Sequence, residues 1–106
     1  MAWIYLISDL ENQGVYKIGM TRCKDINKRK KELQTGNPNI MFVDNTFETD
    51  YPFKIEKMLH NRFAPKQKLN EWYELEQKDI DNFITTCQEF QSICESLKDN
   101  PFFFKK

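Results

Sequence analysis

The sequence predicts an α+β domain in which helices pack against a small sheet. Two short runs rich in β-branched and aromatic residues, 2–8 and 15–19, have the composition of strands, and a third run covers 40–47. Apolar residues recur at helical spacing over 52–63 and over 77–98. The 106 residues are enough for one domain with one core and too few for two.

The first two strands are expected to form an antiparallel hairpin, because only the turn-forming segment 9–14 separates them. Along the first strand, Tyr5 and Ile7 share one face, whereas Ile4 and Leu6 share the other. Because both faces carry apolar side chains, we expect helices to cover much of the sheet.

Between the second and third strands, a glycine precedes a helix, predicted over 24–35, that begins in a run of cations. A glycine at a strand end permits close approach of another group, and a helix N-terminus attracts anions. Ile26 and Leu33 define the inner face of this helix, and Arg29 and Lys30 lie between them. One of these two cations therefore lies along the core-facing stripe, where a charge needs a partner. A buried carboxylate or carbonyl and a bound phosphate both fit that requirement.

The helix predicted over 52–63 places Glu56 and His60 one turn apart, so that their side chains can meet. A single Glu/His pair is a weak metal signal, because metal sites usually have three or more protein ligands. Phosphate and water can nevertheless complete the shell of Mg²⁺. For His60, the alternative is a half-buried ring that is hydrogen-bonded to a backbone carbonyl.

The last helix, predicted over 77–98, has the longest apolar stripe of the chain. The stripe consists of Ile80, Phe83, Ile84, Cys87, Phe90, Ile93, Cys94 and Leu97. It is expected to close the core, and its last turns also offer a surface for a partner. Three phenylalanines at 102–104 either fold back over the core or meet a second subunit in a homodimer. We therefore divide the chain into a core unit, 1–76, and a helix with an aromatic tail, 77–106, which packs on the same domain.

Charge is segregated along the chain, although the formal net charge is zero. Residues 17–68 contain 12 Lys or Arg and 6 Asp or Glu, whereas residues 69–99 contain 2 and 8. A basic face suits a polyanion such as nucleic acid. The alternative is that both parts are simply solvated surfaces.

The composition argues against several other classes of protein. No apolar run approaches the ~20 residues of a membrane span, and the N-terminal residues lack the basic start of a signal peptide. Three scattered cysteines fit a reducing compartment, hence the cytoplasm. The sequence contains no Walker loop, zinc-ligand spacing or dinucleotide fingerprint.

Four blocks follow one another in a recognisable order. They are Val-Tyr-Lys-Ile-Gly at 15–19, Leu-Gln-Thr-Gly-Asn-Pro at 33–38, Glu56 with His60 and Phe63, and Glu-Trp-Tyr at 71–73. Together they resemble the GIY-YIG nuclease superfamily, in particular its small bacterial and phage branch, over residues 2 to 76. The resemblance implies a three-stranded antiparallel sheet flanked by helices, in the cytoplasm of a bacterial or phage-infected cell.

The resemblance also implies a metal-dependent DNA endonuclease or nickase with little sequence specificity of its own. Tyr5 would position or deprotonate the attacking water, and Arg29 would stabilise charge on the scissile phosphate. Glu56 would bind one Mg²⁺ or Mn²⁺ ion, with His60 as its neighbour or as an acid/base partner. The cations expected to contact DNA are Arg22, Lys24, Lys28, Lys30, Arg62, Lys66 and Lys68, and the expected structural motif positions are Gly19 and Trp72.

The chain departs from the superfamily pattern at several positions. Trp3 stands where the first motif has glycine, and Lys17 replaces the second-motif tyrosine. Tyr16 lies one place earlier, but successive strand residues point to opposite faces, so Tyr16 is no simple substitute. An ammonium at Lys17 raises the local potential and would help to bind a phosphodiester. We keep both residues as catalytic candidates, and Asn70 is a nearby candidate for a closing asparagine.

Two other functions remain open at the level of the sequence. One is a non-catalytic nucleic-acid-binding module, favoured by the missing second-motif tyrosine. The other is a phage-type protein-interaction factor that acts through the acidic last helix and the segment 102–104. No membrane association is expected.

Overall fold

Five strands form one antiparallel sheet in the part of the chain that the computed structural model describes, residues 2–22, 25, 28, 31–32 and 41–100. The strand order is β3-β1-β2-β5-β4. The strands are β1 (Ala2–Asp9), β2 (Val15–Thr21), β3 (Met41–Thr49), β4 (Gln67–Leu69) and β5 (Trp72–Glu74). The expected count of three strands was wrong, because the sheet continues into a β4–β5 hairpin.

β1 lies between β2 and β3 and is buried on both faces. The sequence predicted this burial, because both faces of the run carry apolar side chains. The hairpin between β1 and β2 is confirmed, with Tyr5 opposite Gly19 and Ile7 opposite Lys17. Asp9 holds the turn, because its carboxylate accepts bonds from the Glu11 amide at 3.0 Å and the Asn12 side chain at 2.8 Å. Such local side-chain bonds are typical of aspartate in turns.

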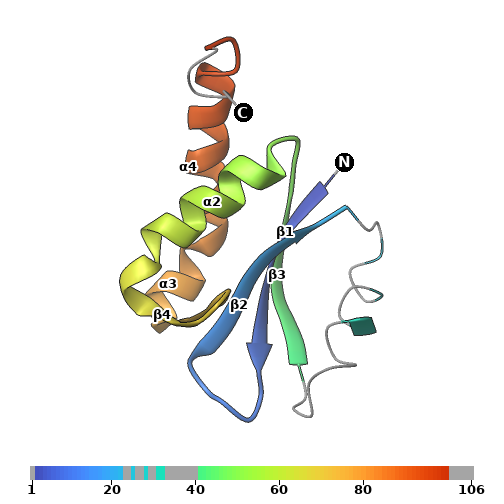
Figure 1. Ribbon diagram of the computed structural model, residues 1–106, viewed down its shortest axis with the longest axis vertical. Helices are drawn as coiled ribbons and strands as arrows, with labels where there is room; N and C mark the ends of the chain where they lie inside the picture. The colour runs from blue at the N-terminus through green and yellow to red at the C-terminus, as the bar shows by residue number, and fades with distance from the viewer. Residues whose placement is uncertain (1, 23–24, 26–27, 29–30, 33–40, 101–106) are drawn as a thin grey trace.

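Two helices, α2 (Pro52–Arg62) and α4 (Phe83–Ser96), pack side by side against the sheet, as Figure 1 shows. α2 begins as predicted, with Pro52 in its first turn, where the missing N–H has no helical partner to lose. Thr49, at the end of β3, accepts a bond from the Tyr51 amide at 3.0 Å and donates to the Gln91 side chain at 2.5 Å. The entry to α2 is thereby tied to α4.

The prediction of one continuous helix over 77–98 was also wrong, because two helices, α3 (Gln77–Asp81) and α4, occupy this segment. Asn82 separates them with φ −98° and ψ 6°, outside helical values. Its side-chain amide donates to the Lys78 carbonyl at 2.8 Å. Side-chain bonds of this kind compete with regular helix, which accounts for the interruption.

The segment between α2 and β5, whose sequence has no apolar pattern and predicts a loop over 64–70, instead contains the 3-10 turn η1 (Ala64–Lys66) and strand β4. Asn70 closes the β4–β5 hairpin with φ +53°, a left-handed conformation that asparagine tolerates better than most residues. Of the helix predicted over 24–35, Lys28, Lys31 and Glu32 are helical, and most of the remaining positions lie outside the described residues.

The two faces of the sheet support two separate hydrophobic clusters. The helix face holds the larger cluster, whose buried members are Ile4, Leu6, Ile18, Ile55, Leu59, Phe63, Tyr73, Leu75, Phe83, Cys87, Phe90 and Cys94. The opposite face holds Tyr5, Ile7 and Met41, with Val43 and Trp72 packed beside them. Among the described residues, no helical side chain belongs to this second cluster. The helices therefore build most of the core on one side.

The last turns of α4 project past the sheet in Figure 1, and Ile93 on them is 41% exposed. This exposure agrees with an apolar stripe that is longer than the core requires. The phenylalanines at 102–104 lie outside the described residues. Cys87 and Cys94 are buried and unpaired. Within the described part of the chain, no helix has the length and apolarity needed to cross a membrane.

Candidate functional site

The candidate site lies beside the second half of β2, which packs against α2. There the pairing between β2 and β5 has ended. The register of β5 against β2 covers Val15–Lys17 and is followed by one bond to the Ile18 amide, so among the described strands the Ile18 carbonyl and the residues after it lie at an open sheet edge. Nε2 of His60 lies 3.0 Å from the Ile18 carbonyl. Because a carbonyl only accepts, this nitrogen carries a proton. The Glu56 carboxylate is hydrogen-bonded to the Met20 backbone. Two α2 side chains thus satisfy the free edge of β2.

Glu71, just before β5, completes a group of three ligand-bearing side chains. One ligand atom each from Glu56, His60 and Glu71 lies within 4.8 Å of the others. The Ile18 amide donates to the Glu71 carbonyl at 3.1 Å, which fixes Glu71 against the edge of β2. All three side chains are partly exposed, so the group is open to solvent and to a ligand.

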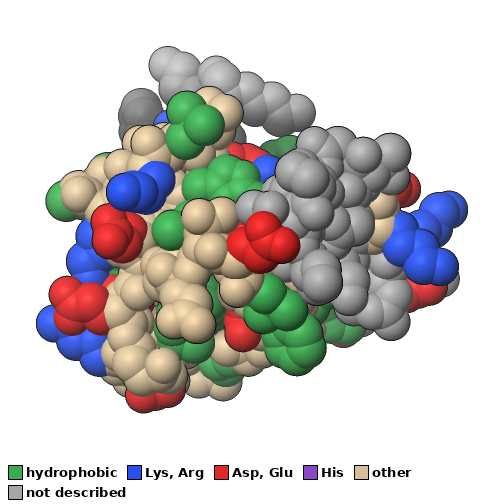
Figure 2. All heavy atoms as spheres, turned by 90° about the horizontal axis from the view of Figure 1, so that it is seen from below, with side chains coloured by type: hydrophobic (Ala, Val, Ile, Leu, Met, Phe, Trp, Pro, Cys, Tyr) green, Lys and Arg blue, Asp and Glu red, His purple; other side chains and the backbone are tan. Residues whose placement is uncertain are grey.

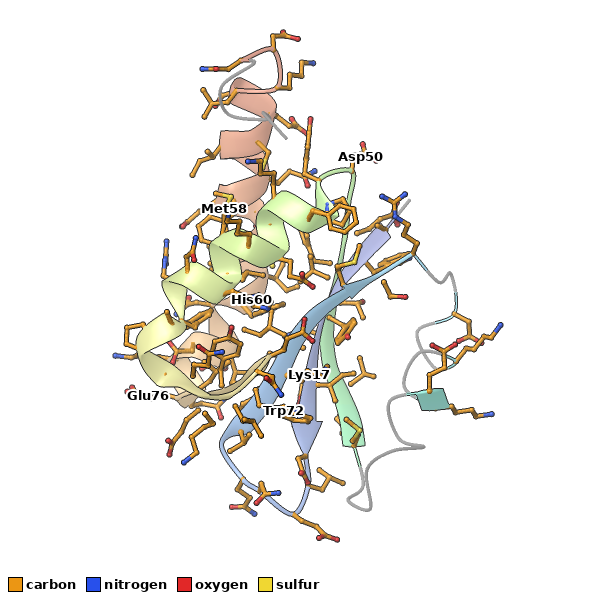
Figure 3. All side chains as sticks on the ribbon, in the orientation of Figure 1. Lys17, Asp50, Met58, His60, Trp72 and Glu76 are labelled. Carbon is orange, nitrogen blue, oxygen red and sulfur yellow. The ribbon has the colours of Figure 1, made fainter. Side chains whose placement is uncertain are left out.

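Lys17 contributes the positive charge of the site. Its Nζ lies 3.1 Å from a carboxylate oxygen of Glu71 and 5.8 Å from the ring centroid of Trp72. Figure 3 shows His60, Lys17 and Trp72 along the same edge of β2, beside α2. From the sequence, Lys17 was a catalytic candidate that raises the local potential, without a named partner. The structure pairs it directly with a carboxylate of the candidate metal group.

The carboxyl of Glu56 has its pKa raised above the usual range. Burial is the largest cause and the nearby Glu71 charge is the second, while His60, the Met20 backbone and Lys17 act in the opposite direction. Two carboxylates close together resist simultaneous ionisation unless a cation shares them. The surroundings of Glu56 therefore favour the binding of either a proton or a cation.

A divalent cation fits this donor set. Carboxylate oxygens suit Mg²⁺ and Mn²⁺, and an imidazole nitrogen is more acceptable to Mn²⁺ than to Mg²⁺. Three protein ligand atoms are fewer than the six that Mg²⁺ takes, so water or phosphate oxygens would complete the shell. The residues that could hold the ion are thus Glu56, Glu71 and His60, where the sequence indicated Glu56 alone.

Tyr73 supports the histidine of the site. Its ring is stacked on the His60 ring, with centroids 5.5 Å apart and planes at 23°. The Tyr73 side chain is almost fully buried, and burial, then Glu71 and Glu56, raise the pKa of its hydroxyl. A phenol with a raised pKa stays protonated and is no base, so the contribution of Tyr73 here is the stacking support of the His60 ring.

Tyr5 lies on the opposite face of the sheet and covers Gly19. A methyl group added to Gly19 would overlap the Tyr5 hydroxyl and ring, so only glycine leaves room for this tyrosine. Tyr5 is 1% exposed and belongs to the second cluster. The absence of a side chain at Gly19 thus permits the close approach of the Tyr5 ring, and the motif role of Gly19 stays a prediction.

The two other strand candidates lie on different faces. Lys17 is the cross-strand partner of Ile7, on the Tyr5 face, and reaches Glu71 around the sheet edge. Tyr16 packs against the large cluster of the helix face, and burial and then Asp44 raise the pKa of its hydroxyl. The structure therefore brings Lys17 to the carboxylates and holds Tyr16 in the core layer.

Arg29, Lys24 and Lys30 lie outside the described residues, so their expected contacts with phosphate remain predictions. Lys28 is exposed. Arg22 follows β2, and its guanidinium carbon lies 5.4 Å from the ring centroid of Phe53, at the start of α2.

The remaining predicted DNA-binding cations are spread over the helix layer and the hairpin. The Arg62 guanidinium carbon lies 5.1 Å from the Phe90 ring centroid. Lys66 bonds to Asp79 at 2.6 Å, and Lys68 lies 3.7 Å from Glu74. Basic and acidic side chains of the described residues alternate on the face shown in Figure 2, with hydrophobic side chains between them. That face offers no large basic patch among the described residues.

The sequence identified the Glu-Trp-Tyr block but gave Glu71 and Tyr73 no role. Because a strand alternates its faces, Glu71 and Tyr73 lie on one side of the chain and Trp72 on the other. What could not be foreseen was that this shared face meets Glu56 and His60. That meeting depends on the register of β5 against β2.

The fold and the site define a small α+β protein with a carboxylate–histidine group at an open sheet edge and a lysine beside it. The family model for the T5orf172 domain matches residues 2–88, and the chain belongs to this family. This phage-associated family favours a nuclease-related or nucleic-acid-related role. No curated protein and no solved structure gives a significant match to the chain.

Proposed function

We propose that this T5orf172 protein is a GIY-YIG-type endonuclease that hydrolyses phosphodiester bonds in DNA with the help of one Mg²⁺ or Mn²⁺ ion. The observation that carries the proposal is the convergence of Glu56, His60 and Glu71 within 4.8 Å, with Lys17 3.1 Å from Glu71. Two carboxylates, an imidazole and an ammonium at an open edge suit the recognition of a cation and a phosphate together.

The side chains of the site would have different roles in the reaction. Glu56 and Glu71 would hold the divalent ion, which supplies positive charge for the phosphate oxygens when bound. Lys17 would add a second positive charge for the phosphodiester once Glu71 turns to the ion. His60 is oriented by the Ile18 carbonyl and the Tyr73 ring, so it can move a proton at a fixed position.

Two further roles rest on the GIY-YIG resemblance. Tyr5, held over Gly19, is the candidate for orienting or deprotonating the attacking water. Arg29 is the candidate for stabilising charge on the scissile phosphate. DNA is the proposed substrate, with the exposed Lys28 as a non-specific phosphate contact.

The test is nicking of supercoiled plasmid in Mg²⁺ or Mn²⁺ by the wild type, Glu56→Gln, Glu71→Gln and Arg29→Ala. We expect each variant to lose at least about tenfold in rate, because each removes a charge placed at the reacting phosphate or its metal. Glu89→Gln, an exposed change on α4, serves as the matched control and keeps wild-type rates. Metal-dependent nicking by the wild type that Glu56→Gln leaves intact would overturn the assignment.

A second function, nucleic-acid binding without cleavage, is favoured by one observation. Lys17 replaces the second-motif tyrosine and is already paired with Glu71. Binding by such a module would be weak and strongly salt-dependent. Wild-type protein that binds plasmid in low salt, releases it in high salt and never nicks it in either metal would establish this alternative.

A further inference from the structure

One row of side chains crosses the sheet beside the candidate site. Register partners place Leu69 opposite Trp72, Trp72 opposite Lys17, Lys17 opposite Ile7, and Ile7 opposite Val43. Directly opposed residues of neighbouring strands lie on one face of a sheet, so the row runs from β4 to β3 on the face opposite α2.

The exposed fraction of the side chains increases from the centre of the sheet to its β4 edge. Ile7 is fully buried in the centre, Trp72 is half-buried, and Leu69 at the sheet edge is 67% exposed. Trp72 packs against the second cluster with one part of its side chain and leaves another part accessible. The β4–β5 end of the row is therefore an apolar surface with a tryptophan at its boundary.

This surface continues directly from the candidate metal group. Glu71 and Trp72 are consecutive, so their Cα atoms are about 3.8 Å apart, and they point to opposite faces of the strand. The Lys17 ammonium contacts both residues, since it is 3.1 Å from the Glu71 carboxylate and 5.8 Å from the Trp72 ring centroid. A phosphate held by Lys17, beside an ion that Glu71 would bind, would bring the attached nucleoside close to the indole.

We infer that Trp72 and Leu69 form a stacking platform for an unpaired nucleobase of the strand bound at the site. Aromatic rings beside a cation bind single-stranded nucleic acid, because bases stack on the ring while the cation attracts the backbone. A nucleobase fits better than an apolar peptide segment, because the surface adjoins phosphate-binding chemistry. The inference rests on the proposed function for the phosphate position, and it adds a preference for single-stranded or locally opened DNA.

Fluorescence of Trp72 tests the platform directly. Trp3→Phe leaves Trp72 as the only tryptophan of the chain. In Ca²⁺, which carboxylates bind and which leaves Lys17 available for the phosphate, a 12-nucleotide oligothymidylate is expected to quench this fluorescence, whereas an abasic oligonucleotide of equal length and charge is not. Equal quenching by both would overturn the proposal, because it would report phosphate binding alone.

Substitutions at the two platform residues supply the second measurement. Trp72→Leu should weaken binding of the oligothymidylate by at least about fivefold, and Trp72→Phe by less, because a phenyl ring still stacks. Leu69→Ala, at an exposed position that leaves folding intact, should weaken it about twofold to fivefold. Folding of each variant is checked by its urea unfolding transition. Unchanged affinity in Leu69→Ala and in a folded Trp72→Leu would refute the platform.

The two proposals fail in different ways. If wild-type protein nicks plasmid but prefers duplex to oligothymidylate, the nuclease assignment stands and the platform is wrong. If oligothymidylate quenches Trp72 and neither metal supports nicking, the platform stands as part of a binding module. Preference for an abasic strand over oligothymidylate contradicts the platform whatever the nicking result.

Discussion

The two faces of the sheet differ in what they contribute. The helix face buries a continuous cluster from α2, α4 and three strands, including fully buried Leu59 and Phe83. The opposite face buries Tyr5, Ile7 and Met41 and keeps Trp72 half-exposed. Burial of apolar area is the main stabilising contribution in a small domain. Among the described residues, the larger buried cluster lies on the helix face, whereas the opposite face leaves Trp72 and Leu69 accessible at its β4–β5 end.

The candidate site lies at the edge that joins these faces. Glu56 and His60 approach it from the helix side, and Lys17 and Trp72 from the other. A substitution on the helix face is therefore expected to alter the site by shifting α2. A substitution on the opposite face is expected to alter it through direct contact.

The largest expected loss in the free energy of unfolding comes from a substitution on the helix face. Leu59→Ala should lower the free energy of unfolding by about 2–5 kcal/mol, because it opens a cavity in a fully buried position next to His60. Ile93→Ala, on the exposed side of α4, is the matched control and should cost less than about 1 kcal/mol. Urea unfolding measures both. Similar costs for the two variants would contradict the dominance of the helix face.

A smaller effect is expected on the opposite face. Gly19→Ala should cost about 1–3 kcal/mol, because the new methyl group overlaps Tyr5. It should also slow nicking, since Tyr5 must move. Gly14→Ala is the control: Gly14 has φ +84° and open space around it, so it is strained by backbone conformation alone. That variant should lose stability and keep its nicking rate, and equal nicking by both variants would separate Tyr5 from the reaction.

The smallest effect concerns the carboxyl of Glu56. Because burial and Glu71 raise its pKa in the folded state, ionisation opposes folding as pH rises above the unfolded value of about 4.3. Glu56→Gln should therefore be more stable than wild type at pH 7, and the difference should vanish near pH 4. Urea midpoints at the two pH values measure it. A Gln variant that is less stable at pH 7 would show that the charge of Glu56 is already well compensated.

Much of the fold could be predicted from local patterns. β1, β2 and α2 were confirmed because alternation and helical spacing act over a few neighbouring residues. β4 was missed because its three exposed residues carry no apolar pattern and are held by pairing with β5. The interruption at Asn82 was missed because the apolar stripe continues across it.

The candidate site was also predicted only in part, because local patterns do not encode contacts between distant segments. The neighbouring positions of Glu56 and His60 follow from helix geometry, and the structure places both at one edge. His60 also makes the carbonyl bond that was its alternative interpretation. The approach of Glu71 and Lys17 depends on how a distant strand pairs with β2, which no local pattern encodes. Contacts between distant segments are where inference from sequence ends.

The hydrogen bonds from α2 to the open edge of β2 have one more consequence, for solubility. An unpaired strand edge is a template for intermolecular β-pairing, and proteins protect such edges by covering them. Here the covering groups are His60, on the Ile18 carbonyl, and Glu56, on the Met20 backbone. Shortening both side chains to alanine would remove these contacts from the backbone of β2, so we expect the double variant to self-associate more than the wild type.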